Sequence, residues 1–312
     1  MDRMAKLEIR FTHHFDEAVR LKDFGYEPIE CAFGQYGSVM GRYNMDHHGR
    51  ESHREGVALR ACRDHFGALS DDPRFVVTGT PDADAVIAII ALAGLTAQAH
   101  LKSAFYELVN AHDTDPIGMD LLASPEGEVL SAFNLTQGLT QSTEGFESAI
   151  GRMLDLLEHG LESEEVEKIR RTDMARRRTA LSDTINLRDR RGDMLPMPDV
   201  DIGAPVIRGP LALSHPGRIL VVKSAVWGFD QWYRVAPVVV SYASRMAKVT
   251  VGCPDVETAE LLFGPGGLKN VWRSLGKGWG GRESIGGSPR GQRLPESTIH
   301  ETADALIDLF EA

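Results

Sequence analysis

The stretch "RFVVTGTPDADAVIAIIALAGL" (residues 74–95) predicts the fold class of the first half of the chain. An apolar run of the strand type leads into a tight turn and then into a helix that is apolar nearly all round. Upstream, "KLEIRF" and "YEPIECAFG" predict strands, and "YNMDHHG" predicts the end of a third. "DEAVRLKDFG", between the first two, predicts a short helix closed by Gly25. Strands that alternate with helices indicate an α/β fold with a mostly parallel sheet flanked by helices.

The second half of the chain predicts a connector and a further domain. "TEGFESAIGRMLDLLEHG" and the charged stretch "ESEEVEKIRRTDMARRRTALSDTI" are helical patterns, and the Pro-rich "MLPMPDVDIGAPVIRGP" is typical of a linker or of an edge segment. Strand and helix signals then return in "GRILVVKSA", "APVVVSYA", "AKVTVGC" and "GLKNVWRSLG". We therefore expect a metal-binding domain at 1–160, a helical connector and linker at 161–205, and a smaller α/β domain at 206–312.

Composition narrows the class of protein. Of 312 residues, 42% are hydrophobic and 25% are charged, which is the balance of a globular protein. The formal net charge of −11 argues against binding to long duplex nucleic acid, so any anion must be held by a local patch or a metal. We expect no membrane span and no secretory signal. Three scattered cysteines, Cys31, Cys62 and Cys253, predict buried thiols in a reducing compartment, so we expect a cytoplasmic protein.

Four polar clusters follow predicted strands or turns of the first domain: "THHFDE" (12–17), "MDHHG" (45–49), "TPDAD" (80–84) and "NAHDTD" (110–115). The carboxyl ends of parallel strands meet at one edge of a sheet, so these clusters are expected to converge. Imidazole and carboxylate ligands without thiolate suit manganese better than they suit structural zinc. Two such ions would clamp both the attacking and the leaving oxygen of a phosphoryl group. Helix capping is the alternative role for Asp16 and Asp84, and His14 and His53 are the weakest candidates.

With these clusters in place, the chain resembles the DHH phosphoesterase superfamily. "NMDHHG" is similar to the superfamily's signature, "THHFDEA" to its first motif and "NAHDTDP" to its fourth, over most of residues 5–120. "GWGGRESIGGSPRG" (278–291) is similar to the glycine-rich loop of the DHH-associated C-terminal domain, which holds the substrate. The resemblance implies a DHH-type catalytic domain and one or two Mn²⁺ ions per chain, with Mg²⁺ or another divalent ion as an alternative.

The resemblance also implies roles for single residues. The metal ligands would be His13, Asp16, Asp46, His47 and either Asp113 or Asp115, which the sequence leaves open. His48 would lie near the scissile phosphate as a catalytic residue. Arg282 stands where the family has a histidine, and its guanidinium could grip a phosphate but could not shuttle a proton. The glycine-rich loop would bind the substrate through Gly280, Gly281, Arg282, Ser284, Gly286, Gly287 and Arg290.

One departure from the family pattern carries a hypothesis. The family has a further Asp at a strand end before DHH, which bridges the metals. Here the acids of that interval are Asp23, Glu27 and Glu30, and none has a convincing strand-then-acid context. We expect Asp82 or Asp84 to supply the bridging carboxylate instead; the rival interpretation is a one-metal or binding-only relative.

These observations favour a metal-dependent hydrolase that acts on a small phosphorylated substrate, such as a nucleotide or a short oligonucleotide. The basic, glycine-rich segment 265–295, with Trp272 and Trp279, suits such a ligand, although both tryptophans are also typical core residues. A non-catalytic nucleotide-binding relative and a metal-dependent hydrolase of another bond, such as an amide, are the alternatives. The sequence leaves the oligomeric state open, with a homodimer as one option.

Overall fold

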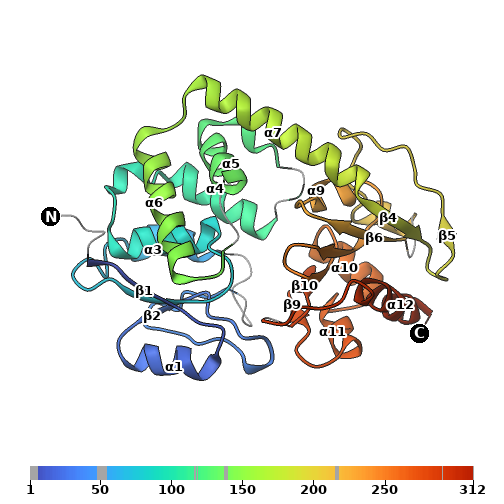
Figure 1. Ribbon diagram of the computed structural model, residues 1–312, viewed down its shortest axis with the longest axis horizontal. Helices are drawn as coiled ribbons and strands as arrows, with labels where there is room; N and C mark the ends of the chain where they lie inside the picture. Colours follow the sequence, from blue (N-terminus) through green and yellow to red (C-terminus); the bar gives the residue numbers. More distant parts are fainter. Residues whose placement is uncertain are drawn as a thin grey trace. The chain divides into compact units, whose positions relative to one another are not determined.

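The computed structural model describes residues 6–47, 55–115, 117, 119–136, 140–214, 218–289 and 291–311. The chain divides into two compact units, Met1–Thr172 and Asp173–Ala312, called here the N-terminal and the C-terminal unit (Figure 1). Both contain helices and strands, so the expected α/β class is confirmed in this broad sense.

A three-stranded parallel sheet organises the N-terminal unit. Its order is β1-β3-β2, and Val77 of β3 pairs with Phe11 of β1 and with Ile29 of β2. All three strands therefore end at the same edge. The elements of this unit are β1 (Glu8–Phe11), α1 (Phe15–Asp23), β2 (Glu27–Ile29), η2 (Gly34–Tyr36), α2 (Val57–Asp64), β3 (Arg74–Val77), α3 (Ala83–Ala93), η3 (Gln98–His100), α4 (Ser103–Thr114), η4 (Leu121–Ala123), α5 (Pro125–Thr136) and α6 (Thr143–His159).

The two faces of this sheet pack against different helices (Figure 1). Val76 lies in a small core with Ala18 of α1, whereas Phe75 and Val77 lie in the large core that contains α3. Side chains alternate between the faces along a strand, so one four-residue strand serves both cores. All residues of α3 are buried, which explains why its sequence is apolar nearly all round.

A seven-stranded mixed sheet organises the C-terminal unit. Its order is β5-β4-β6-β7-β8-β10-β9; β6 and β7 run parallel, and the other neighbours are antiparallel. The elements are β4 (Thr184–Arg188), β5 (Met194–Leu195), α8 (Pro210–Leu213), β6 (Ile219–Ser224), α9 (Phe229–Trp232), β7 (Val238–Ala243), β8 (Lys248–Gly252), α10 (Val256–Phe263), α11 (Lys269–Leu275), β9 (Gly280–Gly281), β10 (Ile285–Gly287) and α12 (Thr298–Glu311).

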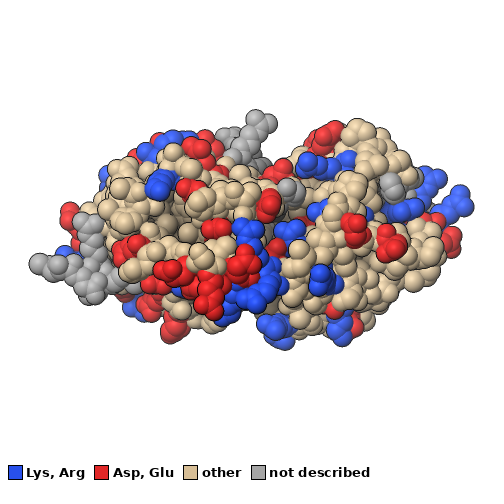
Figure 2. Space-filling model, turned by 90° about the horizontal axis from the view of Figure 1, so that it is seen from above, with Lys and Arg blue, Asp and Glu red and all other residues tan. Residues whose placement is uncertain are grey.

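The expected connector at 161–205 requires a correction. Its first part is the predicted charged helix, α7 (Ser163–Ser182), and the division between the units falls within it, after Thr172. Residues 184–195 are not a linker, because β4 pairs with β6 and β5 pairs with β4 in the large sheet. β5 is the edge strand of that sheet, so the start of the Pro-rich stretch is the edge segment that was its alternative assignment. Figure 2 views the molecule from the side on which α7 lies in Figure 1. Acidic and basic side chains are mixed on this face.

Two further expectations about local structure were wrong. Residues 41–47 form no strand; they are a loop that contains Asn44 in a left-handed conformation, with φ 54°. "NAHDTD" does not follow a strand but ends α4, with Asp115 at its C-cap. Cys31, Cys62 and Cys253 are buried thiols, as predicted. Among the described residues, no helix combines the length and the apolar character needed to cross a bilayer.

Candidate metal centre

The loop that carries Asp46 and His47 is fastened by a buried carboxylate. Glu27 of β2 accepts hydrogen bonds from the backbone N–H of Arg42 at 3.0 Å and of Tyr43 at 2.8 Å. A Cβ at Gly41 would collide with this carboxylate, so only glycine lets the loop backbone approach it. Burial raises the pKa of Glu27 above its ordinary value, and the two N–H groups partly offset that rise.

Further bonds hold the same loop from its other side. The guanidinium of Arg60 donates to the carbonyl oxygens of Asn44 and Asp46, at 2.7 and 3.0 Å. The backbone N–H of Glu30 donates to the carbonyl of Met45 at 2.7 Å. The loop is thus anchored to β2 and α2, and this fixes the position of His47.

One ring nitrogen of His47 faces three carboxylates. Its Nε2 lies 2.8 Å from Glu30 Oε1, 3.2 Å from Asp113 Oδ2 and 3.8 Å from Asp84 Oδ2. The His47 side chain is fully buried, and Glu30 and Asp84 are buried with it. Ligand atoms of Glu30, His47 and Asp84 all lie within 4.8 Å of one another, which is a spacing that can hold a metal ion.

Asp84 also closes the start of α2. Its carboxylate accepts hydrogen bonds from the backbone N–H groups of Val57 and Ala58, at 2.8 and 2.9 Å. The preceding residue is Gly56, where a Cβ would lie 2.5 Å from Asp84 Oδ1. Asp84 therefore has the capping role that was its alternative assignment, although for α2 rather than for its own helix. The same carboxylate still faces His47.

Asp82 caps α3 by accepting the N–H of Ala85 at 3.0 Å. It is also close enough to Glu30, Asp84 and Asp113 for their charges to act on it. Burial raises the pKa of Asp82 and of Asp84 well above the ordinary range, and the charges of Glu30 and Asp113 raise them further. His47 can neutralise at most one of these negative charges. The donor set, one imidazole among carboxylates, is that of a hard or borderline divalent cation such as Mn²⁺.

The structure brings together only part of the predicted ligand set. Asp46 is buried next to His47 in the chain, and Asp84 and Asp113 contact the cluster. His13, Asp16 and Asp115 have exposed side chains and lie outside the group whose ligand atoms are within reach of one another. The predictions for His48, His53 and Arg290 fall outside the described residues.

The residue of this group that sequence reasoning missed is Glu30. The predicted strand "YEPIECAFG" ran through this residue, but β2 ends at Ile29 and Glu30 is the next residue. Glu30 is thus an acid directly after a strand, which is the position that the bridging Asp has in the family before DHH. It also adopts a left-handed conformation, with φ 50°, which is uncommon for a residue with a side chain and is often found at functional sites.

The predicted substrate loop is a β-hairpin in which Gly281, Gly286 and Gly287 have packing reasons to be glycine, whereas Gly280 has none. The N–H of Arg282 donates to the carbonyl of Ile285 at 2.7 Å and closes the turn between β9 and β10. A Cβ at Gly286 would lie 2.5 Å from Cζ2 of Trp272, which is a core residue. Glu283 pairs with Lys269, so part of the local basic charge is neutralised.

Replacing Gly286 by alanine is expected to destabilise the C-terminal unit by about 1–3 kcal/mol, because the added methyl group overpacks Trp272. Gly280→Ala is the matched control, since a Cβ there meets nothing within 4 Å. Urea denaturation of both variants measures the difference. Equal stability of the two variants would mean that close packing is not why Gly286 is a glycine.

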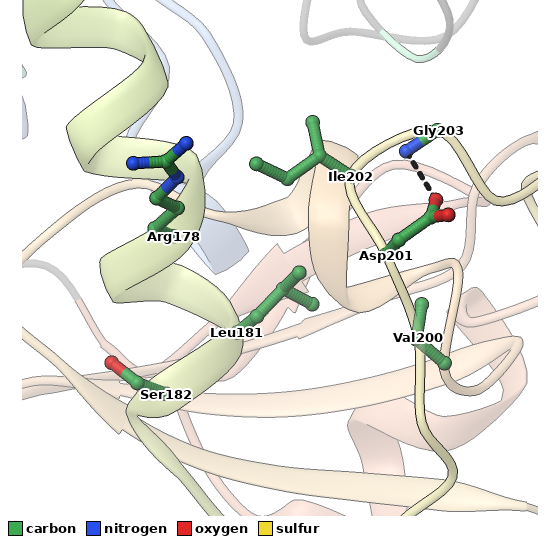
Figure 3. Close-up of a pocket in the computed structure, with 7 residues that line it drawn as sticks. All are labelled: Arg178, Leu181, Ser182, Val200, Asp201, Ile202 and Gly203. Carbon is green, nitrogen blue, oxygen red and sulfur yellow. Dashed lines mark hydrogen bonds between the residues drawn. The ribbon is translucent and has the colours of Figure 1, made fainter.

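A separate surface pocket of about 650 Å³ lies in the C-terminal unit, between α7 and the loop 200–203 (Figure 3). Arg178, Leu181 and Ser182 form one wall, and Asp201 on the other wall accepts the N–H of Gly203 at 2.6 Å. None of its lining residues is a predicted site residue, so this pocket is separate from the candidate metal centre.

Comparison of the chain with models of protein families, with curated proteins and with solved structures found no match in any of the three. What this chain does must therefore be inferred from its own residues.

Proposed function

We propose that the N-terminal unit is a divalent-metal-dependent phosphoesterase, a divergent relative of the DHH superfamily. The observation that carries the proposal is the cluster in which Nε2 of His47 faces the buried Glu30 and Asp84 and the partly exposed Asp113. Buried carboxylates that repel one another are stable together only if they are protonated or share a cation. A cation resolves that repulsion at neutral pH.

The residues present fit such an ion. Glu30, His47 and Asp84 would hold it, and the mixed donor set suits Mn²⁺. Asp113, 3.2 Å from His47, would be a further ligand, with Asp82 as an adjacent negative charge. When bound, a divalent ion polarises a phosphoryl oxygen and lowers the pKa of water, which is the chemistry that phosphoester hydrolysis needs.

The chain's own contribution is to hold the cluster rigid. Glu27 and Arg60 fix the loop of His47, and the amides of α2 fix Asp84. Groups that are placed before the reaction lose little free energy on reorganising in the transition state. On the resemblance alone, we also propose that Arg282 and the β9–β10 hairpin recognise the phosphate of a small substrate such as a nucleotide.

A non-catalytic metal-binding or nucleotide-binding protein is the second candidate. Asp84 already accepts two backbone N–H groups, and His13 and Asp16 lie outside the cluster. Both observations favour one ion over two, and a single ion lacks the paired clamp on attacking and leaving oxygens. This candidate predicts that Mn²⁺ binds but that no phosphoester is hydrolysed.

Asp113→Asn and Asp115→Asn test the proposal as a matched pair. Asp113 lies 3.2 Å from His47, whereas Asp115 is exposed two residues further on. We expect Asp113→Asn to weaken Mn²⁺ binding and turnover by roughly 10- to 100-fold, as loss of a ligand charge does. Asp115→Asn should stay within about twofold of wild type, because an exposed carboxylate contributes little.

The measurements are Mn²⁺ titration by calorimetry and a panel of phosphate mono- and diesters with and without Mn²⁺. Mn²⁺ binding without turnover of any ester would support the binding protein. Equal losses in the two variants would contradict the proposed ligand set.

A further inference from the structure

The hydroxyl of Thr78 is buried and has no hydrogen-bond partner among the described residues. Only 4% of this residue is exposed. Thr12, which directly follows the neighbouring strand β1, is just as buried, but its hydroxyl donates to Glu17 at 2.6 Å and accepts the N–H of His14 at 3.0 Å. A buried hydroxyl without a partner is costly, so a retained one calls for an explanation such as a ligand.

Thr78 lies at the carboxyl edge of the sheet, in line with the candidate metal centre. It directly follows β3, the central strand, whose last residue pairs with Phe11 and with Ile29. The next residues across the edge are therefore Thr12, Thr78 and Glu30, about 4.8 Å apart in the pairing direction. Ligands of open α/β sheets bind outside this edge, so Thr78 is placed beside the proposed ion.

The start of α1 lies on the same side of the sheet. Side chains alternate along β3, and this alternation predicts that Thr78, like Val76, faces α1. The N-cap residue of α1, His14, makes no side-chain hydrogen bond to the first turn. Backbone N–H groups at such a helix start attract anions.

We infer that the Thr78 hydroxyl and the first-turn amides of α1 bind a phosphoryl oxygen of the substrate. The inference rests on the proposed function, because Asp16 and Glu17 in the same turn would repel an anion that came without a cation. A phosphoryl group that is also bound by the divalent ion would accept the hydrogen bond of the Thr78 hydroxyl. Its negative charge would be balanced by the metal, so Asp16 and Glu17 would not repel it. Thr78 is then a substrate-binding residue that no motif of the sequence had indicated.

Thr78→Val tests this inference, because valine keeps the shape and removes the hydroxyl. We expect the Mn²⁺-loaded variant to bind inorganic phosphate, and to turn over an ester by kcat/KM, roughly 10- to 100-fold more weakly, which is the effect of one hydrogen bond to a charged group. Mn²⁺ affinity should be unchanged. The melting temperature of the metal-free protein should be unchanged or higher, since the variant removes an unpaired buried polar atom.

Thr78→Ser should restore phosphate binding, and Thr96→Val is the matched control. Thr96 is also buried with an unpaired hydroxyl, but it lies beyond the far end of α3 from Asp82. Wild-type phosphate affinity in Thr78→Val, or no phosphate binding by the Mn²⁺-loaded wild type, would overturn the inference. Bound Mn²⁺ and phosphate without turnover of any ester would instead refute only the proposed catalysis.

Discussion

Replacing His47 by alanine is expected to weaken Mn²⁺ binding by at least about 100-fold and to remove metal-dependent turnover. The reason is geometric: a single nitrogen, His47 Nε2, lies within 2.8–3.8 Å of three carboxylate oxygens. Without it, Glu30, Asp84 and Asp113 keep their mutual repulsion and lose the neutral donor that completes the ligand set. Calorimetric Mn²⁺ titration and the phosphoester panel measure the two losses.

A control must separate loss of the site from loss of the fold. His159 also pairs with an aspartate, Asp155, at 3.2 Å, but on the exposed surface of α6. His159→Ala should keep Mn²⁺ affinity and turnover within about twofold, since exposed pairs contribute little. Circular dichroism should show that His47→Ala is still folded. Mn²⁺ affinity that survives in a folded His47→Ala protein would remove His47 from the centre and contradict the proposal.

The parts of the fold that the sequence predicted are those where local pattern and burial agree. The stretch 74–95 is a strand, a turn and a helix in the structure, because β3 is covered on both faces and α3 is buried on all sides. The strands β6, β7 and β8 likewise match apolar runs that are buried in the large sheet. Hydrophobic periodicity in a sequence reflects which side chains are buried, so it predicts secondary structure best where burial is regular along the element.

The loop of the candidate site was not predictable in the same way. Residues 41–47 are held by Glu27, Arg60 and Glu30, which are distant in sequence and give no local signal. Glu30 itself was missed because β2 has only three residues, and the left-handed turn that follows has no glycine to announce it. The residue types of the DHH stretch suggested a metal, and Asp84 and Asp113 were among the candidate ligands, whereas Glu30 became visible only through its tertiary contact with His47.

The free energy of unfolding of the metal-free protein is expected to carry an unusual pH dependence. Burial and neighbouring charges raise the folded pKa of Asp82 and Asp84 above the ordinary value of 3.8. In the folded state these groups therefore bind protons more tightly than in the unfolded state. Their contribution to stability is fully present below about pH 3.8, and it is lost as the pH rises through their raised folded pKa. Each pKa unit of difference corresponds to about 1.4 kcal/mol.

Mn²⁺ should reverse this dependence. The ion binds the ionised carboxylates, so its stabilising effect grows with pH, and an ion at 100 times its Kd adds about 2.7 kcal/mol. Urea denaturation from about pH 4 to about pH 8, with and without Mn²⁺, measures both slopes. Asp230, whose pKa is lowered by Arg176, contributes to the pH dependence of stability with the opposite sign. The contribution of the candidate metal centre is therefore the difference in slope between wild type and Asp84→Asn.

Asp84→Asn should flatten the pH dependence of the metal-free protein and abolish the gain from Mn²⁺, because the amide has no proton to lose and binds the ion poorly. Asp115→Asn, at an exposed position, should leave both slopes as in wild type. If Mn²⁺ stabilised wild type and Asp84→Asn equally at every pH, the ion would bind elsewhere. A metal-free wild type as stable at about pH 7 as at about pH 4, with no difference from Asp84→Asn, would mean that the acids do not repel one another. The cluster would then need no cation, and the main reason to place a metal between Glu30, His47 and Asp84 would be gone.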